Sequence, residues 1–272
     1  MPKKEKDKKV RITSALAELK SEVLAENIPI LIEYFLNNHN RYLDTLQHLD
    51  VNSSVNKKIL DVGILPGHMG LTLQKLGFAV DGISFGKRVE EICAHTLKKL
   101  RDRNITVIHM DIEKDTLPCK DNTYDYIIFT DVIEHLSSNI LGVMKELRRV
   151  LKPEGRLILS TPNVANIGNR IEILKGRNIY WQMYQYYERD SEDRHNREFT
   201  LAEVKDLLRR TGFEVKEEKY FMHMPEALLL NGYRSSVFKF LKSRFVYFLA
   251  KIHPPFRSLF LIVAQKKHGT KT

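Results

Sequence analysis

The sequence predicts an α/β protein built on a doubly wound, mostly parallel β-sheet. Short apolar runs rich in β-branched residues alternate with segments whose apolar residues recur every three or four positions. The first run, 57–62, leads into a turn that contains Gly63 and Gly67, and a helical pattern follows at 71–76. Such alternation is typical of parallel sheets that bind ligands at the carboxyl ends of their strands.

Seven strands and the helices between them are expected in chain order. The expected strands are 57–62, 78–83, 105–108, 124–129, 156–160, one that starts at 213, and 259–264. Helices are expected around 89–100 and 140–151, where apolar residues keep three-and-four spacing. A last helix is expected between Thr200, which with Glu203 matches a capping box, and Gly212, which suits a helix end.

Two segments lie outside the alternating pattern. Residues 1–50 carry a basic tail and two helices, separated near Pro29 and expected to pack over the mouth of the main domain. Residues 51–272 form that domain, and 225–257 are a basic insertion before the last strand, too long for an ordinary hairpin loop. Within the insertion, 235–252 has an apolar helical face, which suits either anionic lipid or the protein's own core.

Composition limits the cellular compartments in which the protein is expected. The chain has 272 residues, a formal net charge of +10 and two cysteines without metal or redox spacing. No apolar run approaches the ~20 residues of a transmembrane helix, and the charged N-terminus lacks the apolar core of a secretory signal. A cytoplasmic protein is expected, with peripheral contact at the inner membrane face left open. The basic ends either meet anionic lipid, nucleic acid or an acidic substrate, or only solvate the chain.

Several motifs in order resemble class I S-adenosylmethionine-dependent methyltransferases, particularly the type 11 and 12 group. They are Leu60-Asp61-Val62-Gly63 with Gly67, Val80 to Ser84, Met110-Asp111, Asp131-Val132-Ile133-Glu134-His135-Leu136 and Ser160-Thr161-Pro162-Asn163. The resemblance covers residues 57–222. It implies the Rossmann-like methyltransferase fold, with an antiparallel last strand, and S-adenosyl-L-methionine as the cofactor.

The resemblance also implies where the cofactor binds. Asp61 would order the glycine loop and the amino group, Asp111 would accept from the adenine N6, and Asp131 would lie beside the methionyl group. His68 either tunes the cofactor loop or is simply exposed. The full implied set is Asp61, Gly63, Gly67, His68, Ser84, Asp111, Ile112 and Asp131.

Two residues depart from the family pattern. Leu65 stands where a further glycine is usual and bars the closest approach of the backbone to a ligand. Ser84 replaces the carboxylate that normally receives the ribose hydroxyls, and Asp81 is expected to point to the other face of the sheet. A neutral hydroxyl there loses roughly 1–1.5 kcal/mol of hydrogen bonding, which is about tenfold in affinity and leaves catalysis plausible.

The acceptor side is expected to depend on histidines. An oxygen acceptor must lose its proton, and histidine is the natural base near neutral pH. His135 follows the fourth strand, and His195 lies in a polar loop with Arg197, which is expected to contact the acceptor. The structural alternatives are that His135 bonds backbone at a helix start and that the loop only forms a salt bridge with Glu198.

Other candidates keep two interpretations. Glu134 with His135 could hold a divalent metal, but an acid–histidine pair alone is poor evidence, so no metal is predicted; otherwise Glu134 is a solvated first-turn acid. The aromatic segment 180–187 includes Trp181 and Tyr184. It forms either a wall for a sugar or apolar acceptor or a cap packed on the domain.

The function predicted from the sequence is methyl transfer from S-adenosylmethionine to a small-molecule or sugar/glycan-type oxygen acceptor. The glycan preference rests only on the resemblance of 160–163 and 195–200 to methyltransferases that act on glycans. A non-catalytic protein that binds the cofactor or a partner is the alternative that Leu65 and Ser84 suggest. A nucleic-acid methyltransferase is disfavoured, because the Asn/Asp-Pro-Pro-aromatic motif of base methylation does not follow the fourth strand.

Overall fold

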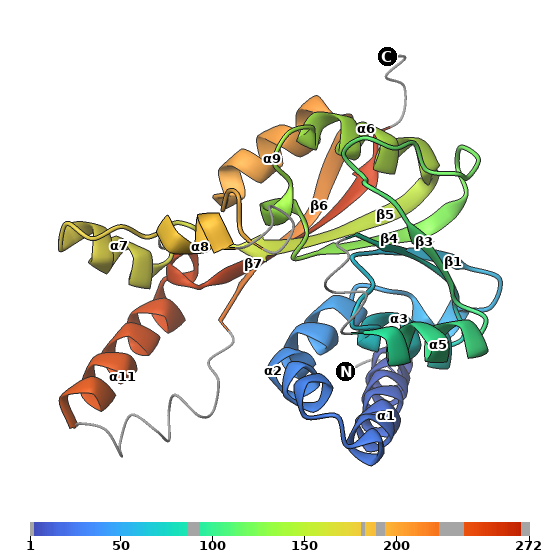
Figure 1. The fold of residues 1–272 in the computed structure, drawn as a ribbon, viewed down its shortest axis with the longest axis horizontal. Coiled ribbons are helices and arrows are strands. Elements are labelled where there is room, and N and C mark those ends of the chain that lie inside the picture. The colour runs from blue at the N-terminus through green and yellow to red at the C-terminus, as the bar shows by residue number, and fades with distance from the viewer. Residues whose placement is uncertain (1–2, 86–92, 181–182, 189–193, 223–236, 268–272) are drawn as a thin grey trace.

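The computed structural model describes residues 3–85, 93–180, 183–188, 194–222 and 237–267. Their centre is one seven-stranded sheet of order β3-β2-β1-β4-β5-β7-β6 (Figure 1). The strands are β1 Lys58–Val62, β2 Ala79–Ser84, β3 Thr106–His109, β4 Tyr124–Thr130, β5 Leu151–Pro162, β6 Phe213–Phe221 and β7 Leu259–Lys266. Strands β1 to β5 pair in parallel, and β7 runs antiparallel to both β5 and β6. The predicted mostly parallel sheet with an antiparallel last strand is confirmed.

Helices cover both faces of the sheet. One face packs on α1 Lys3–Glu26, α2 Pro29–Leu46, α3 His68–Lys75 and α5 Ala94–Asp102, and the other on α6 Ile140–Val150 and α9 Leu201–Arg210. Alternation along the strands divides the apolar side chains between these two cores. In β1, Ile59 belongs to the first core and Leu60 to the second, and in β4 Ile128 and Ile127 divide in the same way. The central strands are therefore buried on both faces, as parallel sheets require.

Local signals in the sequence fix several element ends. Helix α1 ends at Glu26, before Asn27 with a φ of 52°, and Pro29 opens α2, as predicted. The capping box at Thr200 and Glu203 is present and starts α9. Strand β5 begins earlier than expected, because Leu151 already pairs with Tyr124 of β4.

A separate lobe extends from the end of β5 and β7 (Figure 1). It contains α7 Ile167–Leu174, α8 Met183–Glu188, α11 Val237–Ile252 and the short turn η4 Pro254–Phe256. We call this lobe the arm. Asn163 joins it to the sheet, because its Nδ2 donates to the carbonyls of Pro255 and Arg257. Within the described residues, no helix is long and apolar enough to cross a membrane.

Candidate functional site

A cavity of about 310 Å³ opens at the carboxyl ends of β1, β2 and β4. Its wall includes Gly63 and Leu65 from the turn after β1, Ser84 from the end of β2, and Asp131 from the end of β4. Helix α2 covers the cavity and contributes Tyr34. Of the two expected N-terminal helices, α2 lines the cavity, and the pocket lies at the edge of the sheet that the sequence predicted.

The turn after β1 is held tightly in place. Gly63 has a φ of 77°, and its N–H and that of Ile64 donate to the carbonyl of Ile83. A Cβ at position 63 would lie 2.8 Å from Cγ2 of Val132, so the position has no room for a side chain. Leu65 lines the cavity rather than filling it, so the backbone at Gly63 is still part of the wall.

The carboxylates of Asp61, which is buried, and Asp131, which is partly exposed, face a narrow extension of the cavity. Asp61 and Asp131 both line it, and each has one oxygen (Oδ2 and Oδ1 respectively) without a hydrogen-bond partner among the described residues. Burial raises the pKa of Asp61 to about 7. Arg41 of α2 forms an ion pair with the other oxygen of Asp131. Acceptors of this kind suit a ligand that brings a positive charge and N–H donors.

His68 lies under the same extension and is not exposed. Only 2% of its surface is accessible, and its ring packs edge-on against Phe35, with ring centroids 5.3 Å apart. Burial lowers its pKa to about 4, and Nδ1 lies 3.3 Å from the hydroxyl of Tyr42. The alternative of an exposed histidine is wrong, because α2 covers it, and a neutral imidazole supports the turn from below.

The far end of the cavity continues between the segment that follows β3 and the turn that follows β4. Asp111 and Ile112 line this part together with Phe85 and His135. Ser84 is buried beside it, whereas Asp81 accepts from the Tyr124 hydroxyl at 2.8 Å and so faces away, as predicted.

Glu113 is a residue of this region that sequence reasoning missed. Its carboxylate accepts from the backbone N–H groups of Ser137, Ser138 and Asn139. Burial acts to raise its pKa, but these bonds outweigh that effect and hold it at about 2. The only feature of the sequence that pointed to Glu113 was its position directly after Ile112, a predicted cofactor residue. The carboxylate fixes the loop that forms one wall of the far end.

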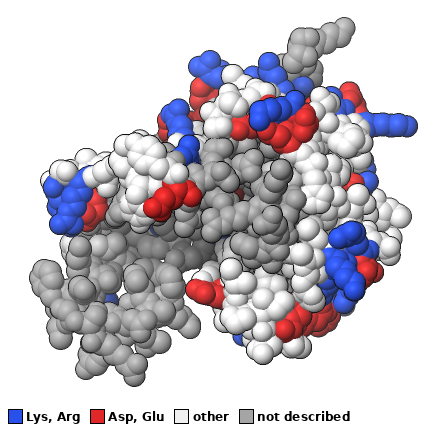
Figure 2. Space-filling view, viewed as in Figure 1, with Lys and Arg blue, Asp and Glu red and all other residues white. Residues whose placement is uncertain are grey.

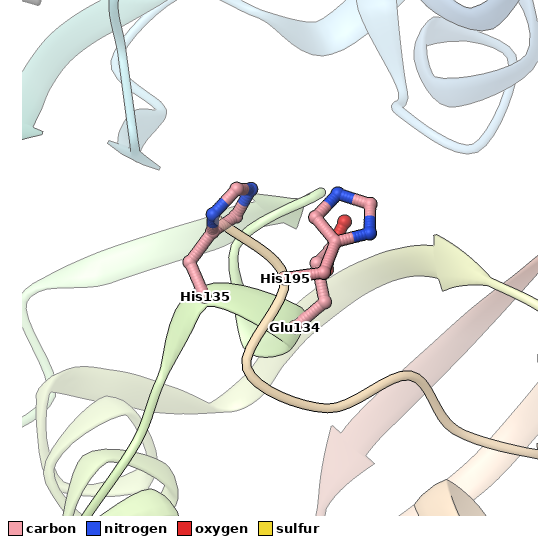
Figure 3. A group of neighbouring side chains, drawn as sticks. All are labelled: Glu134, His135 and His195. Atoms are coloured by element: carbon pink, nitrogen blue, oxygen red, sulfur yellow. The ribbon is translucent and has the colours of Figure 1, made fainter. Parts of the chain in front are cut away.

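A polar cluster lies beside the cavity, where β4 ends. Glu134 and His135 are in the short turn η2 Ile133–His135, and His195 reaches them from a loop about sixty residues later (Figure 3). One ligand atom from each side chain lies within 4.8 Å of the others. Glu134 is fully buried and accepts from the Thr161 hydroxyl at 2.9 Å, so the interpretation as a solvated acid is wrong. Burial raises its pKa.

Backbone and side-chain bonds fix the loop on the turn. The N–H of Asn196 donates to the carbonyl of Glu134 at 2.7 Å, and its Nδ2 donates to the carbonyl of His135. Nδ1 of His135 lies 3.0 Å from the carbonyl of Arg194. His195 lies beside His135, and its Nδ1 is 3.0 Å from a carboxylate oxygen of Glu198, which is the salt bridge named in the structural alternative.

The remaining candidates lie elsewhere. Arg197 is exposed, forms an ion pair with Glu203 and lies over the ring of Phe199. Tyr184 is exposed on α8 and lines none of the cavities described above. Trp181 lies outside the described residues.

Comparison with known proteins fits this geometry. Residues 33–218 match the family model described as a methyltransferase domain, which is more than half of the chain. The chain belongs to this family. By family it is a class I S-adenosylmethionine-dependent methyltransferase, and the buried acceptors of Asp61 and Asp131 fit the cationic cofactor.

Curated relatives match over shorter stretches. A probable S-adenosylmethionine-dependent methyltransferase of Mycolicibacterium smegmatis is 27% identical over 198 residues, 72% of this chain and 66% of the relative. A demethylmenaquinone methyltransferase of Tropheryma whipplei is 33% identical over 103 residues, 38% of this chain and 41% of its own length. A ubiquinone biosynthesis O-methyltransferase of Vibrio campbellii is 32% identical over 39% of this chain and 44% of the relative. The match thus spans about two fifths of the two quinone-related proteins.

Solved structures share the fold. The putative methyltransferase of Haloferax volcanii, solved with the activator Trm112, aligns with a TM-score of 0.59 and 14% identity over 92% of this chain and 98% of its own. The phosphoethanolamine N-methyltransferase 2 of Haemonchus contortus, solved with S-adenosyl-L-methionine, aligns with a TM-score of 0.56 and 17% identity over 84% of this chain and 53% of its own.

Proposed function

We propose that this chain transfers a methyl group from S-adenosylmethionine to an oxygen of a small-molecule or sugar-type acceptor. The observation that carries the proposal is the joint position of two sites at one sheet edge. Buried, partnerless carboxylate oxygens of Asp61 and Asp131 suit the cationic cofactor, and the cluster of Glu134, His135 and His195 lies beside the same cavity. Relatives named as O-methyltransferases support oxygen as the acceptor atom.

S-adenosylmethionine supplies, when bound, a methyl group on a positively charged sulfur, an electrophile that needs no further activation. The chain's residues therefore have to hold the acceptor oxygen in line with the methyl and keep water away. Transfer breaks the carbon–sulfur bond, leaves its electron pair on sulfur and forms the oxygen–carbon bond. The hydroxyl proton must leave, and His135 and His195 are the groups proposed to assist its departure.

The cofactor residues are proposed in the order of the cavity. Asp61 and Gly63 would receive the amino acid end, with Gly67 and His68 holding the turn from behind. Asp131 would lie beside the methyl.

Ser84, Asp111 and Ile112 would line the ribose and adenine end, with Glu113 holding its wall. Tyr184 and Arg197 are proposed to contact the acceptor only if the arm and the loop move toward the cavity, and Trp181, outside the described residues, stays a proposed acceptor contact.

The experiment is a transfer assay with isotope-labelled methyl on S-adenosylmethionine and fractionated small-molecule and glycan extracts. We expect label in an acceptor fraction with the wild-type chain, and a loss of at least tenfold in His135→Ala and His195→Ala. Exposed His95 of α5 provides the control His95→Ala. Cofactor binding without transfer to any fraction would instead favour the non-catalytic alternative.

We also propose that the arm rests on an anionic lipid surface. Several of its described apolar side chains are exposed, with Leu174 86% and Phe245 60% accessible: Ile173, Leu174, Tyr184, Tyr187, Phe245, Phe248 and Ile252. Helix α11 carries four basic residues and no acidic one, which complements anionic headgroups. On the face that Figure 2 shows, lysine and arginine of the described surface are mixed with acids in small groups.

Vesicle flotation tests this contact. The chain should float with vesicles of phosphatidylcholine and phosphatidylglycerol at low salt, and less with phosphatidylcholine alone. Phe245→Glu with Phe248→Glu should abolish flotation, whereas Leu141→Glu, an exposed leucine on α6, should not. Failure to float with the anionic vesicles would overturn the membrane proposal and leave the methyltransferase proposal intact.

A further inference from the structure

We propose that Glu134, His135 and His195 form a binding site for one divalent transition-metal ion, with Zn²⁺ as the first candidate. The binding itself does not depend on the proposed function, although the role given to the ion below rests on it. Two histidines and one carboxylate, with positions left for other ligands, are a donor set that binds catalytic zinc and non-haem iron.

The distances fit one shared ion. Zinc forms bonds of about 2.0–2.2 Å to histidine nitrogen and carboxylate oxygen, so two ligands of one ion lie at most about 4.4 Å apart. The ligand atoms of the three side chains all lie within 4.8 Å of one another. Binding of one ion would therefore draw the three side chains closer together. Two ligands are adjacent in the turn η2, and the third comes from a loop bonded to that turn by Asn196 (Figure 3).

The carboxylate provides an independent indication of a cation. Glu134 is completely buried, its Oε2 accepts from the Thr161 hydroxyl, and its Oε1 has no hydrogen-bond partner among the described residues. A buried carboxylate oxygen without a hydrogen-bond partner is costly, because it has lost its hydrogen bonds to water without replacing them. A metal ion at the side chains that converge there would supply the missing interaction.

Both imidazoles are oriented as metal ligands usually are. Nδ1 of His135 lies 3.0 Å from the Arg194 carbonyl, which can only accept, so the proton is on Nδ1 and the lone pair on Nε2. Nδ1 of His195 lies 3.0 Å from the Glu198 carboxylate, with the same consequence. Histidines that bind metals commonly donate their other N–H to a carbonyl or a carboxylate, which fixes the tautomer and the ring orientation.

The position of the cluster gives the ion a role in the proposed reaction. His135 belongs both to the cluster and to the wall of the cavity. An acceptor oxygen that enters from the cavity can occupy an open position, where a divalent ion lowers the pKa of a bound hydroxyl. The histidines would then favour loss of the proton through the ion, and acceptors with two neighbouring oxygens would bind best.

The experiment measures metal content and affinity rather than turnover. The full chain is stripped with a chelator, and Zn²⁺ is then titrated by calorimetry, with bound zinc counted by mass spectrometry after dialysis. We expect one ion per chain. Glu134→Gln and His195→Ala should each weaken binding at least tenfold, and the exposed-histidine control His95→Ala should not.

Glu198→Gln keeps all three ligands and removes only the carboxylate that orients His195, so it remains informative if a ligand variant does not fold. It should weaken Zn²⁺ binding about tenfold. No stoichiometric zinc in the wild-type chain, or equal affinity in the wild type and in the folded variants, would overturn the site. Zinc binding without methyl transfer would refute the proposed function alone, and full transfer by the stripped chain would refute the role of the ion.

Discussion

The cofactor end of the sheet and the arm differ in how closely their side chains are packed. Around Asp61 and Gly63 the structure leaves no freedom: the carboxylate is buried, and a Cβ at position 63 would meet Val132. On the arm, Leu174 and Phe245 are exposed although both are apolar. The cofactor end is therefore tightly packed, whereas the arm has an apolar surface that suits an external partner.

The most severe way to break the cofactor end is Gly63→Val. The substitution forces a β-branched residue to a φ of 77° and against Val132, so we expect cofactor affinity to fall at least about thirtyfold, roughly 2 kcal/mol. Equilibrium dialysis with labelled S-adenosylmethionine measures it. Gly176→Val has the same kind of strain, with a φ of 69°, but meets nothing within 4 Å. A similar loss of affinity in both variants would show that strain alone, and not closeness to the ligand, is responsible.

The buried carboxylate should make cofactor affinity depend on pH. The pKa of Asp61 is about 7 in the folded chain, and a cationic ligand needs the ionised form, so binding releases a proton. Affinity should rise about tenfold from pH 6 to pH 8, as the ionised fraction grows. Asp61→Asn should bind weakly and show no such rise when titrated at both pH values. A wild-type affinity that is flat over this range would contradict the assignment.

The same group links pH to stability in the cofactor-free chain. The folded pKa of about 7 exceeds the ordinary value of 3.8, so the contribution of Asp61 is complete below pH 3.8 and is lost as the pH rises through 7. At pH 8, Asp61→Asn should therefore unfold at a higher temperature than the wild type without cofactor. Scanning calorimetry at pH 5 and pH 8 checks this, and a variant less stable at pH 8 would refute it.

Thr200 caps α9, directly after the loop that carries His195. Thr200→Ala removes the hydroxyl that accepts from the N–H of Glu203, although the backbone N–H of residue 200 can still donate to the Glu203 carboxylate, and should lower the free energy of unfolding by about 1 kcal/mol. Denaturant titration measures the loss. Thr200→Ser keeps the hydroxyl and should restore most of it, so equal destabilisation by both would exclude the cap as the cause.

Substitutions on the arm should have the smallest effect on stability and on cofactor affinity. Phe245→Ser changes a side chain that is 60% exposed, so the free energy of unfolding should change by less than about 0.5 kcal/mol and cofactor affinity should not change. Leu73→Ala, which truncates a fully buried leucine of α3 in the core against the sheet, should cost about 2–5 kcal/mol in the same denaturant titration. A large loss in Phe245→Ser would show that the arm packs on the body of this chain after all.

The sequence predicted what local signals determine. Pro29, the glycine turn at Gly63 and the capping box at Thr200 act over a few residues, and each has the predicted effect. The order of motifs then predicted the sheet and the cofactor.

Contacts between distant segments were not predictable from spacing. Arg41 pairs with Asp131 across ninety residues, and the Thr161 hydroxyl reaches the buried Glu134. His195 meets His135 only because a loop docks on η2, so a pair of candidate metal ligands in the sequence became three in the fold.

The most direct test of the central claim is a calorimetric titration of the wild-type chain with S-adenosylmethionine and, separately, with its demethylated product. One molecule should bind per chain in both cases, with affinity that rises between pH 6 and pH 8 because Asp61 ionises. The absence of measurable binding to both ligands would contradict the assignment of the cavity at β1, β2 and β4 as the cofactor site.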